Sequence, residues 1–207
     1  MTDLFQEPED ATPLMPEERD GLKQSWITTR HDLNEAEQEN IVRGAAWARR
    51  SRGLTVTKLL TAGFVKNLHK RMFGDVWKWA GTYRLTRRNI GIEAYRIPEE
   101  LAAMLGDVRY WGEHKTFPPD EIAIRLHHRL VAVHPFPNGN GRHARLIADL
   151  LIERLGSQPF SWGGGRLADA GELRAKYIAA LQAADNHNIE PLLAFARLSL
   201  HCSPNPW

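Results

Sequence analysis

The sequence predicts an all-α domain that carries one short β-hairpin. Apolar residues recur at helical spacing over most of the chain, and Pro or Gly stands at the ends of these stretches. The helical period is lost between Tyr83 and Ile97, where Gly91 separates two pieces rich in β-favouring residues. The length of 207 residues and the 43% hydrophobic content suit one domain with a sizeable core.

The N-terminal part is expected to begin irregularly and then form one long helix. Residues 1–33 open with a stretch rich in Pro, Glu and Asp and are taken as an irregular segment on the surface. A helix is expected over residues 35–50, with Asn34 and Glu37 as its capping box. This helix defines a unit of residues 34–54.

Residues 55–207 are expected to form the main body. Proline at a first helical position, glycine beyond a last one and apolar stripes between them mark its helices. These expected helices cover residues 55–74, 98–111, 119–133, 142–155, 172–184 and 190–200. The hairpin of residues 83–97 interrupts the series.

Composition excludes several classes of protein. No apolar run approaches the ~18 residues of a membrane helix, and the acidic N-terminus lacks the apolar stretch of a secretory signal. A single cysteine, Cys202, excludes an intrachain disulfide. We therefore expect a cytoplasmic protein with no membrane partner. The net charge of +2 does not call for nucleic acid either, because short basic runs such as residues 49–52 and 84–88 are usually solvated.

One loop between two expected helices, residues 134–145, has the composition of an anion site. It reads His-Pro-Phe-Pro-Asn-Gly-Asn-Gly-Arg-His-Ala-Arg. Gly139 and Gly141 flank Asn140 and allow the backbone to approach a ligand closely. The loop leads directly into a helix N-terminus, where unpaired N–H groups and the helix dipole favour anions.

The charged residues of the same loop supply the rest of a transfer site. Arg142 and Arg145 are three residues apart, so both can reach one anion and grip phosphate oxygens. His134 titrates near neutral pH and can take a proton from an attacking hydroxyl. A base, an anion nest and two guanidiniums within twelve residues predict phosphoryl or nucleotidyl transfer.

This string resembles the signature of Fic proteins, His-x-Phe-x-(Asp/Glu)-Gly-Asn-Gly-Arg-x-x-Arg. Resemblance extends over most of the chain: Trp79-Ala80-Gly81 followed by Arg84 is similar to the family's lead-in to a flap, and residues 177–195 to its closing helices. Residues 12–14 and 25–30 resemble the subgroup labelled mobile mystery protein B. The resemblance implies a Fic-type helical fold with residues 55–207 as the catalytic core. It also implies transfer of AMP from ATP to a Ser, Thr or Tyr hydroxyl of another protein.

The resemblance also implies a role for each residue of the loop. His134 would be the general base and Phe136 the anchor of the loop in the core. The phosphates would be cradled by Gly139, Asn140 and Gly141, with Asn140 on the α-phosphate. Arg142 and Arg145 would hold the β and γ phosphates. The flap, with Ile90, Gly91 and Ile92, would align a target segment by adding it as a strand.

Asn138 departs from the Fic signature. It stands where the family has Asp or Glu as a Mg²⁺ ligand, and its amide offers an oxygen without a charge. We expect weaker Mg²⁺ binding, with the nucleotide phosphates supplying most of the ligands. Because altered motifs accompany other reactions in the family, transfer of a different phosphate-containing group stays open, as does a catalytically dormant module that binds a nucleotide and recognises a partner.

Many Fic proteins are restrained by a helix with the pattern (Ser/Thr)-x-x-x-Glu-(Gly/Asn). Glu39-Asn40 matches its last two positions, although Glu35 replaces Ser or Thr at the first. The resemblance implies that Glu39 pairs with Arg145 and blocks the γ-phosphate. The alternative is a solvated acidic helix face. The target protein is not revealed, and a homo-oligomer stays open.

Overall fold

The computed structural model describes residues 4–5, 13–163 and 170–198, and the predicted all-α class is confirmed there. Its α-helices are α1 (Pro16–Arg19), α2 (Arg30–Arg50), α3 (Val56–Leu59), α4 (Ala62–Phe73), α5 (Ile97–His114), α6 (Pro119–Val133), α7 (Asn140–Arg154), α8 (Ala170–Asp185) and α9 (Glu190–Arg197). A short 3₁₀-helix, Ala94–Arg96, precedes α5. No helix in the described part of the chain is both long and apolar enough to cross a membrane.

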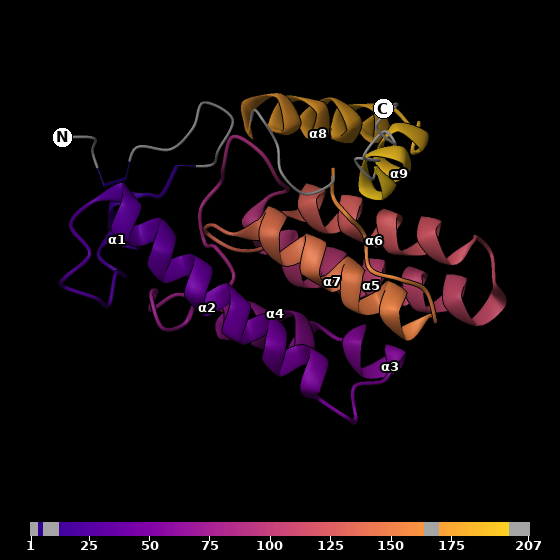
Figure 1. The fold of residues 1–207 in the computed structure, drawn as a ribbon, viewed down its shortest axis with the longest axis horizontal. Helices are drawn as coiled ribbons and strands as arrows, with labels where there is room; N and C mark the ends of the chain where they lie inside the picture. Colours follow the sequence, from indigo (N-terminus) through magenta and orange to yellow (C-terminus); the bar gives the residue numbers. More distant parts are fainter. Residues whose placement is uncertain (1–3, 6–12, 164–169, 199–207) are drawn as a thin grey trace, which may run out of the picture.

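The helices form two packed groups that meet at the α6–α7 loop (Figure 1). In the first group α5, α6 and α7 lie side by side, and in the second α2 packs along α4. The α8–α9 pair lies above α6 in the same view. Buried apolar side chains from all these helices join in one core, including Leu68, Leu101, Leu126 and Ile147. The core therefore fixes the loop from both of its flanking helices.

Helix α2 begins at Arg30 rather than at Glu35. Thr29 is the N-cap and accepts a hydrogen bond from the Asp32 backbone N–H at 3.2 Å, while the Asp32 carboxylate accepts one from the Thr29 N–H at 2.9 Å. The capping box predicted at Asn34 and Glu37 is therefore wrong. The reciprocal Thr–Asp pair satisfies two N–H groups that the helix start would leave unpaired. Glu37 lies in the second turn of the helix and is buried.

The single helix predicted for residues 55–74 is divided into α3 and α4. Thr55 caps α3 and Thr61 caps α4, each accepting a hydrogen bond from the backbone N–H three residues on, at 3.2 and 3.1 Å. Threonine competes well for helix N–H groups, so a second cap inside an apolar stretch starts a new helix. The apolar spacing alone does not reveal this break.

The hairpin predicted for residues 83–97 is not formed. The described residues contain no extended ladder, and their one β-bridge joins Leu22 to Trp77. Residues 86 and 89–92 form bends, and the carbonyls of Thr86 and Ile92 accept hydrogen bonds from the Arg84 guanidinium. A side chain thus takes the place of the partner strand.

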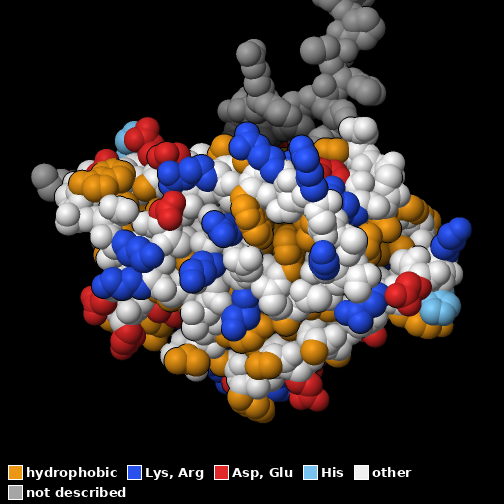
Figure 2. Space-filling view, turned by 90° about the horizontal axis from the view of Figure 1, so that it is seen from below, with side chains coloured by type: hydrophobic (Ala, Val, Ile, Leu, Met, Phe, Trp, Pro, Cys, Tyr) orange, Lys and Arg blue, Asp and Glu red, His pale blue; other side chains and the backbone are white. Residues whose placement is uncertain are grey.

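The lower face of the molecule in Figure 1 is shown directly in Figure 2, where Lys and Arg side chains outnumber Asp and Glu. Helices α2, α3 and α4 lie lowest in the first view and so contribute to this face. The site lies on the other side of these helices, toward α8.

Candidate functional site

A cavity of about 1080 Å³ lies between the α6–α7 loop, α8, α2 and the segment at residues 89–92. It collects every residue of the predicted transfer site and of the predicted flap: His134, Asn138, Gly139, Asn140, Gly141, Arg142, Arg145, Ile90, Gly91 and Ile92. Glu39 does not line it, whereas Glu37 does. The predicted site residues therefore lie together in space, except that Glu37 takes the place predicted for Glu39.

The α6–α7 loop is built by two left-handed residues and one side-chain clamp. His134 ends α6 with φ +51°, and Gly139 precedes α7 with φ +78°. Asn140 accepts a hydrogen bond from the Phe136 N–H at 2.9 Å and donates one to the Phe136 carbonyl at 2.8 Å. The Asn140 side chain is therefore used within the loop. What α7 can offer a phosphate is its backbone N–H groups and its dipole.

His69 of α4 supports the loop from below. Its ring is fully buried, stacks on Phe136 at 3.8 Å between centroids, bonds to the Asn138 carbonyl at 3.0 Å and accepts from the Gly81 N–H at 3.0 Å. Burial lowers the pKa of His69 well below its usual range, with help from the neighbouring His143. His69 is thus a neutral connector between α4, the Trp79–Gly81 stretch and the loop, and no sequence pattern pointed to it.

His134 stands at the other end of the loop in a setting that keeps it neutral. Burial lowers its pKa to about 4, the Arg84 and Arg88 charges act in the same direction, and a hydrogen bond to the Val131 backbone opposes them. At neutral pH the imidazole therefore carries no proton on one nitrogen and can accept one. Its burial and the two arginines suit a base rather than an acid.

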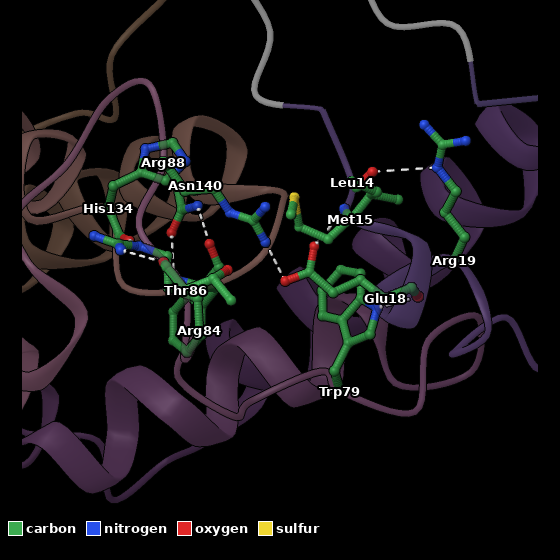
Figure 3. A network of polar contacts seen from close by, with 11 residues as sticks. Leu14, Met15, Glu18, Arg19, Trp79, Arg84, Thr86, Arg88, His134 and Asn140 are labelled. Atoms are coloured by element: carbon green, nitrogen blue, oxygen red, sulfur yellow. Dashed lines mark hydrogen bonds and ion pairs between the residues drawn. The ribbon is translucent and has the colours of Figure 1, made fainter.

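Arg84 fixes the backbone of His134 and the flap segment at once (Figure 3). Its fully buried guanidinium donates to the carbonyls of His134 at 2.7 Å, Thr86 at 2.8 Å, Val133 at 3.4 Å and Ile92. The carbonyls of Val133 and His134 are among those left unpaired at the end of α6, where a cation is favoured. Arg84 thus caps α6 and ties residues 86–92 to it.

Gly91 permits the closest part of this contact. A Cβ at Gly91 would lie 2.7 Å from the His134 Cβ and 2.8 Å from the Arg84 guanidinium, and Gly91 has φ +98°. Both the space and the dihedral angle require glycine. The flap segment can therefore rest directly beside the imidazole.

The N-terminal segment holds the flap from outside. Arg88 forms an ion pair with Glu18 of α1 in which the Arg88 side chain is 3% exposed, and the Glu18 carbonyl accepts from the Trp79 indole at 3.0 Å (Figure 3). Leu14, just before α1, lines the cavity. Seventy residues separate Glu18 from Arg88, so no local pattern could predict their contact.

Glu37 is the acidic residue that reaches the loop. Its carboxylate lies 2.6 Å from the Arg142 guanidinium and accepts from the Trp77 indole at 2.7 Å, and its side chain is 7% exposed. The prediction that Glu39 pairs with Arg145 is wrong in this structure: the Glu39 side chain is 72% exposed and lies 3.5 Å from Arg43. Residues two apart on a helix point about 200° apart, so they cannot share a face.

The model of the Fic/DOC family matches residues 59–152. These residues form a Fic/DOC family domain. The protein adenylyltransferase fic-1 of Caenorhabditis elegans is 32% identical over 135 residues, which are 63% of this chain and 25% of that protein. This chain thus spans about a quarter of that curated relative.

Solved structures agree with the Fic fold. Fic-1 (residues 134–508) from C. elegans superposes with a TM-score of 0.62 at 26% identity, covering 86% of this chain and 56% of that one. BepC from Bartonella tribocorum, solved with bound AMPPNP, superposes with a TM-score of 0.64 at 20% identity, covering 88% and 97%. The second likeness shows the fold alone.

Helices α2 and α8, outside the matched Fic/DOC stretch, also line the cavity, and one residue of each contacts an arginine of the loop. One is Glu37 of α2, described above. The other is Tyr177 of α8, whose ring lies 5.3 Å below the Arg145 guanidinium carbon and whose hydroxyl bonds to His127 at 2.9 Å. Burial raises the pKa of Tyr177, while Arg145 works against that shift. Tyr177 therefore positions Arg145 on the cavity wall, a role that its place in a plain helical pattern did not suggest.

The Fic/DOC domain offers few ligands for a metal ion. No three His, Cys, Asp or Glu side chains in the described part of the chain are grouped to hold one. Asn138, at the predicted Mg²⁺ position, accepts from the Gly139 N–H with its side-chain oxygen, and the Arg142 guanidinium lies 3.4 Å from the same atom. Such an uncharged oxygen fits Mg²⁺ only when nucleotide phosphates supply most of the other ligands.

Proposed function

We propose that this chain transfers AMP from ATP to a hydroxyl side chain of a target protein. One observation carries the proposal: a single cavity wall holds a neutral buried His134, the N-terminus of α7, and both Arg142 and Arg145. The relatives named protein adenylyltransferase and the AMPPNP-bound BepC support the donor and the reaction. The role proposed for each residue of the loop follows from its position in the Fic signature.

In the proposed step the target hydroxyl oxygen attacks the α-phosphorus of ATP. His134 takes the hydroxyl proton, the new oxygen–phosphorus bond forms, and the bond to the pyrophosphate oxygen breaks. The α7 N–H groups and the two arginines stabilise the charge on the phosphates. The proton passes from His134 to solvent when pyrophosphate leaves. Residues 90–92, which lie beside His134, present the target segment.

The cavity provides a place for each part of the nucleotide. Helix α8 lines it with Leu173, Tyr177 and Ile178, an apolar wall suited to a base. Mg²⁺ would be held by the phosphates and by the Asn138 oxygen, and it would supply charge neutralisation on the phosphates. The chain's own residues would bind and orient the nucleotide and deprotonate the target hydroxyl.

We further propose that an N-terminal glutamate restrains the reaction and that it is Glu37. The Arg142 N–H that donates to Glu37 at 2.6 Å cannot donate to a phosphate oxygen at the same time, and the Glu37 carboxylate repels a phosphate that approaches the same guanidinium. Trp77 holds the carboxylate in that position through its indole N–H. Nucleotide binding therefore has to compete with a buried ion pair.

Further sequence expectations stay proposals. They are the division into residues 1–33, 34–54 and 55–207, membership of the mobile mystery protein B subgroup, location in the cytoplasm, and a hydroxyl-bearing protein target. The subgroup proposal is supported by residues 12–14 and 25–30 of the sequence. The proposed transfer requires the hydroxyl-bearing target but does not depend on the other three.

The test is transfer of label from α-labelled ATP with Mg²⁺ in a host lysate, with self-modification scored on the same gel. We expect transfer to rise in Glu37→Gly and to vanish in Glu37→Gly/His134→Ala. Transfer that survives in the double variant would remove His134 from the reaction. Absence of transfer in wild type and in both variants, with ATP binding retained in calorimetry, would favour the dormant module or a different transferred group.

A further inference from the structure

The positive charge of this chain is concentrated in one stretch. Residues 43–80 contain a single acidic residue, Asp75, and nine basic ones, whereas the whole chain has a net charge of only +2. The basic residues are Arg43, Arg49, Arg50, Arg52, Lys58, Lys66, Lys70, Arg71 and Lys78, and all are exposed. Acidic residues outnumber basic ones in the rest of the sequence, so the net charge of the whole chain does not reveal this cluster.

The fold assembles part of this charge around a surface hollow. Helices α2 and α4 pack side by side, and a hollow of about 440 Å³ is lined by Arg43, Trp47 and Arg50 of α2. Arg71 of α4 joins them, because its guanidinium carbon lies 5.0 Å above the Trp47 ring. Three guanidiniums from two helices thus surround one indole. We call the exposed surface that carries the nine basic residues the α2–α4 basic face; helices α2, α3 and α4, which bear seven of them, contribute to the side of the molecule shown in Figure 2.

Little of this charge is neutralised within the fold. Arg43 pairs with Asp75 at 2.7 Å and Arg49 with Glu153 at 3.1 Å. Among the described residues, no acidic side chain forms an ion pair with the other seven. A face with that much uncompensated charge raises the local potential and attracts a polyanion.

The composition of the face distinguishes between classes of polyanion. Helices α2, α3 and α4 expose one large hydrophobic side chain, Val42. Protein interfaces generally bury an apolar or aromatic centre and contain little Lys, and membrane-surface helices need a broad apolar face. Nucleic-acid interfaces are more polar and far more positive. The basic residues that α2 contributes to this face lie in its C-terminal half, residues 43–50, which spans ~11 Å, and α4 packs beside α2 and widens the charged area.

We propose that the α2–α4 basic face binds the phosphate backbone of double-stranded nucleic acid without reading its sequence. The face lies outside the transfer site, so binding does not depend on the proposed reaction. The three guanidiniums around Trp47 form its centre, and α4 also carries the exposed Lys66 and Lys70, of which Lys66 lies 5.0 Å over the Tyr83 ring. Sequence reasoning from net charge did not expect nucleic acid, because that count averages over the whole chain.

The test is fluorescence anisotropy of a labelled 20-base-pair duplex of random sequence between 50 and 200 mM salt, with the full chain. We expect binding that weakens steeply with salt and does not change with ATP. Arg50→Gln/Arg71→Gln should lower the slope of log affinity against log salt by about 2, since each lost phosphate contact removes ~0.9. Lys66→Gln/Lys70→Gln should lower it as well and keeps the Arg71–Trp47 contact.

The matched control is Lys115→Gln/Lys176→Gln, which removes two positive charges outside residues 43–80 and should leave the slope unchanged. Circular dichroism of each variant verifies that it is folded. Absence of binding at 50 mM salt, or an equal loss in the control, would overturn the proposal. Equally tight binding of polyglutamate would also overturn it and would indicate an acidic protein partner.

Discussion

Replacing Glu37 by Gln should tighten the binding of ATP. The Glu37–Arg142 pair has a 2.6 Å contact, with side chains 7% and 36% exposed. Two charges ~4 Å apart attract by ~4 kcal/mol at an effective dielectric constant of 20, and partial exposure of Arg142 reduces this value. We take ~2 kcal/mol as the part that a phosphate has to displace, which corresponds to about 30-fold in affinity. Gln removes the charge and retains an oxygen for the Trp77 indole.

The assay is calorimetric titration of ATP into wild type, Glu37→Gln and Glu39→Gln. The last variant is the matched control, because it removes the exposed carboxylate two residues further along the same helix. It should bind ATP like wild type. Adding Arg142→Gln to Glu37→Gln should abolish the gain. An unchanged affinity in Glu37→Gln, or an equal gain in Glu39→Gln, would refute the view that Glu37 withholds Arg142.

Three further predictions concern the His134 end of the loop, and a fourth concerns stability. Arg84→Gln should lower kcat for transfer by about 10- to 100-fold with little change in ATP affinity, because it loses charge-assisted bonds to His134 and the flap rather than to the nucleotide; steady-state kinetics beside calorimetry separates the two. Gly91→Ala should reduce transfer in the same assay, since its Cβ would lie 2.7 Å from that of His134. Rate profiles should place the acidic limb of transfer near pH 4, where burial sets the pKa of His134. The free energy of unfolding should fall as the pH drops from about 6.5 toward 4, because His127, His134 and His143 bind protons in the unfolded chain but stay neutral in the folded one. Asp149, whose pKa burial raises to about 6, opposes this trend. Urea titrations at several pH values measure the free energy.

Local signals were sufficient for most of the fold and for the loop. Helical apolar spacing and Pro or Gly at helix ends located the helices, since these features act within one or two turns. The α6–α7 loop could be predicted because its charged and glycine residues lie within twelve residues and lead into the N-terminus of one helix. The grouping of His134, Arg142 and Arg145 therefore required no tertiary information.

What escaped prediction depends on side-chain contacts that apolar spacing and β propensity do not specify. Glu37 and Glu39 look alike in a run of acidic residues, and only packing against Trp77 shows which one turns inward. The hairpin was expected from β-favouring residues, but a buried Arg84 binds the carbonyls that a strand would have used. The first error missed a partner 40 residues away, whereas the second missed a side chain within eight residues of the carbonyls that it binds.

The amide of Asn138 gains its significance from these contacts. An Asp at this position would place a second carboxylate beside Arg142, whose guanidinium lies 3.4 Å from the present amide oxygen. Arg142 would then be shared between two anions, and the hold of Glu37 would weaken. The same carboxylate would be a better ligand for Mg²⁺, which prefers charged oxygen. With Asn138, by contrast, Glu37 is the one carboxylate that contacts Arg142 among the described residues.

Asn138→Asp should therefore make nucleotide binding more dependent on Mg²⁺. Calorimetry of ATP with and without Mg²⁺ should show a larger gain from the metal in Asn138→Asp than in wild type, by about tenfold if one new carboxylate contact contributes ~1.4 kcal/mol. Asn138→Ser, which removes the amide without adding charge, is the control and should show no such gain. If both variants respond to Mg²⁺ as wild type does, Asn138 does not face the metal, and the phosphates alone must hold it.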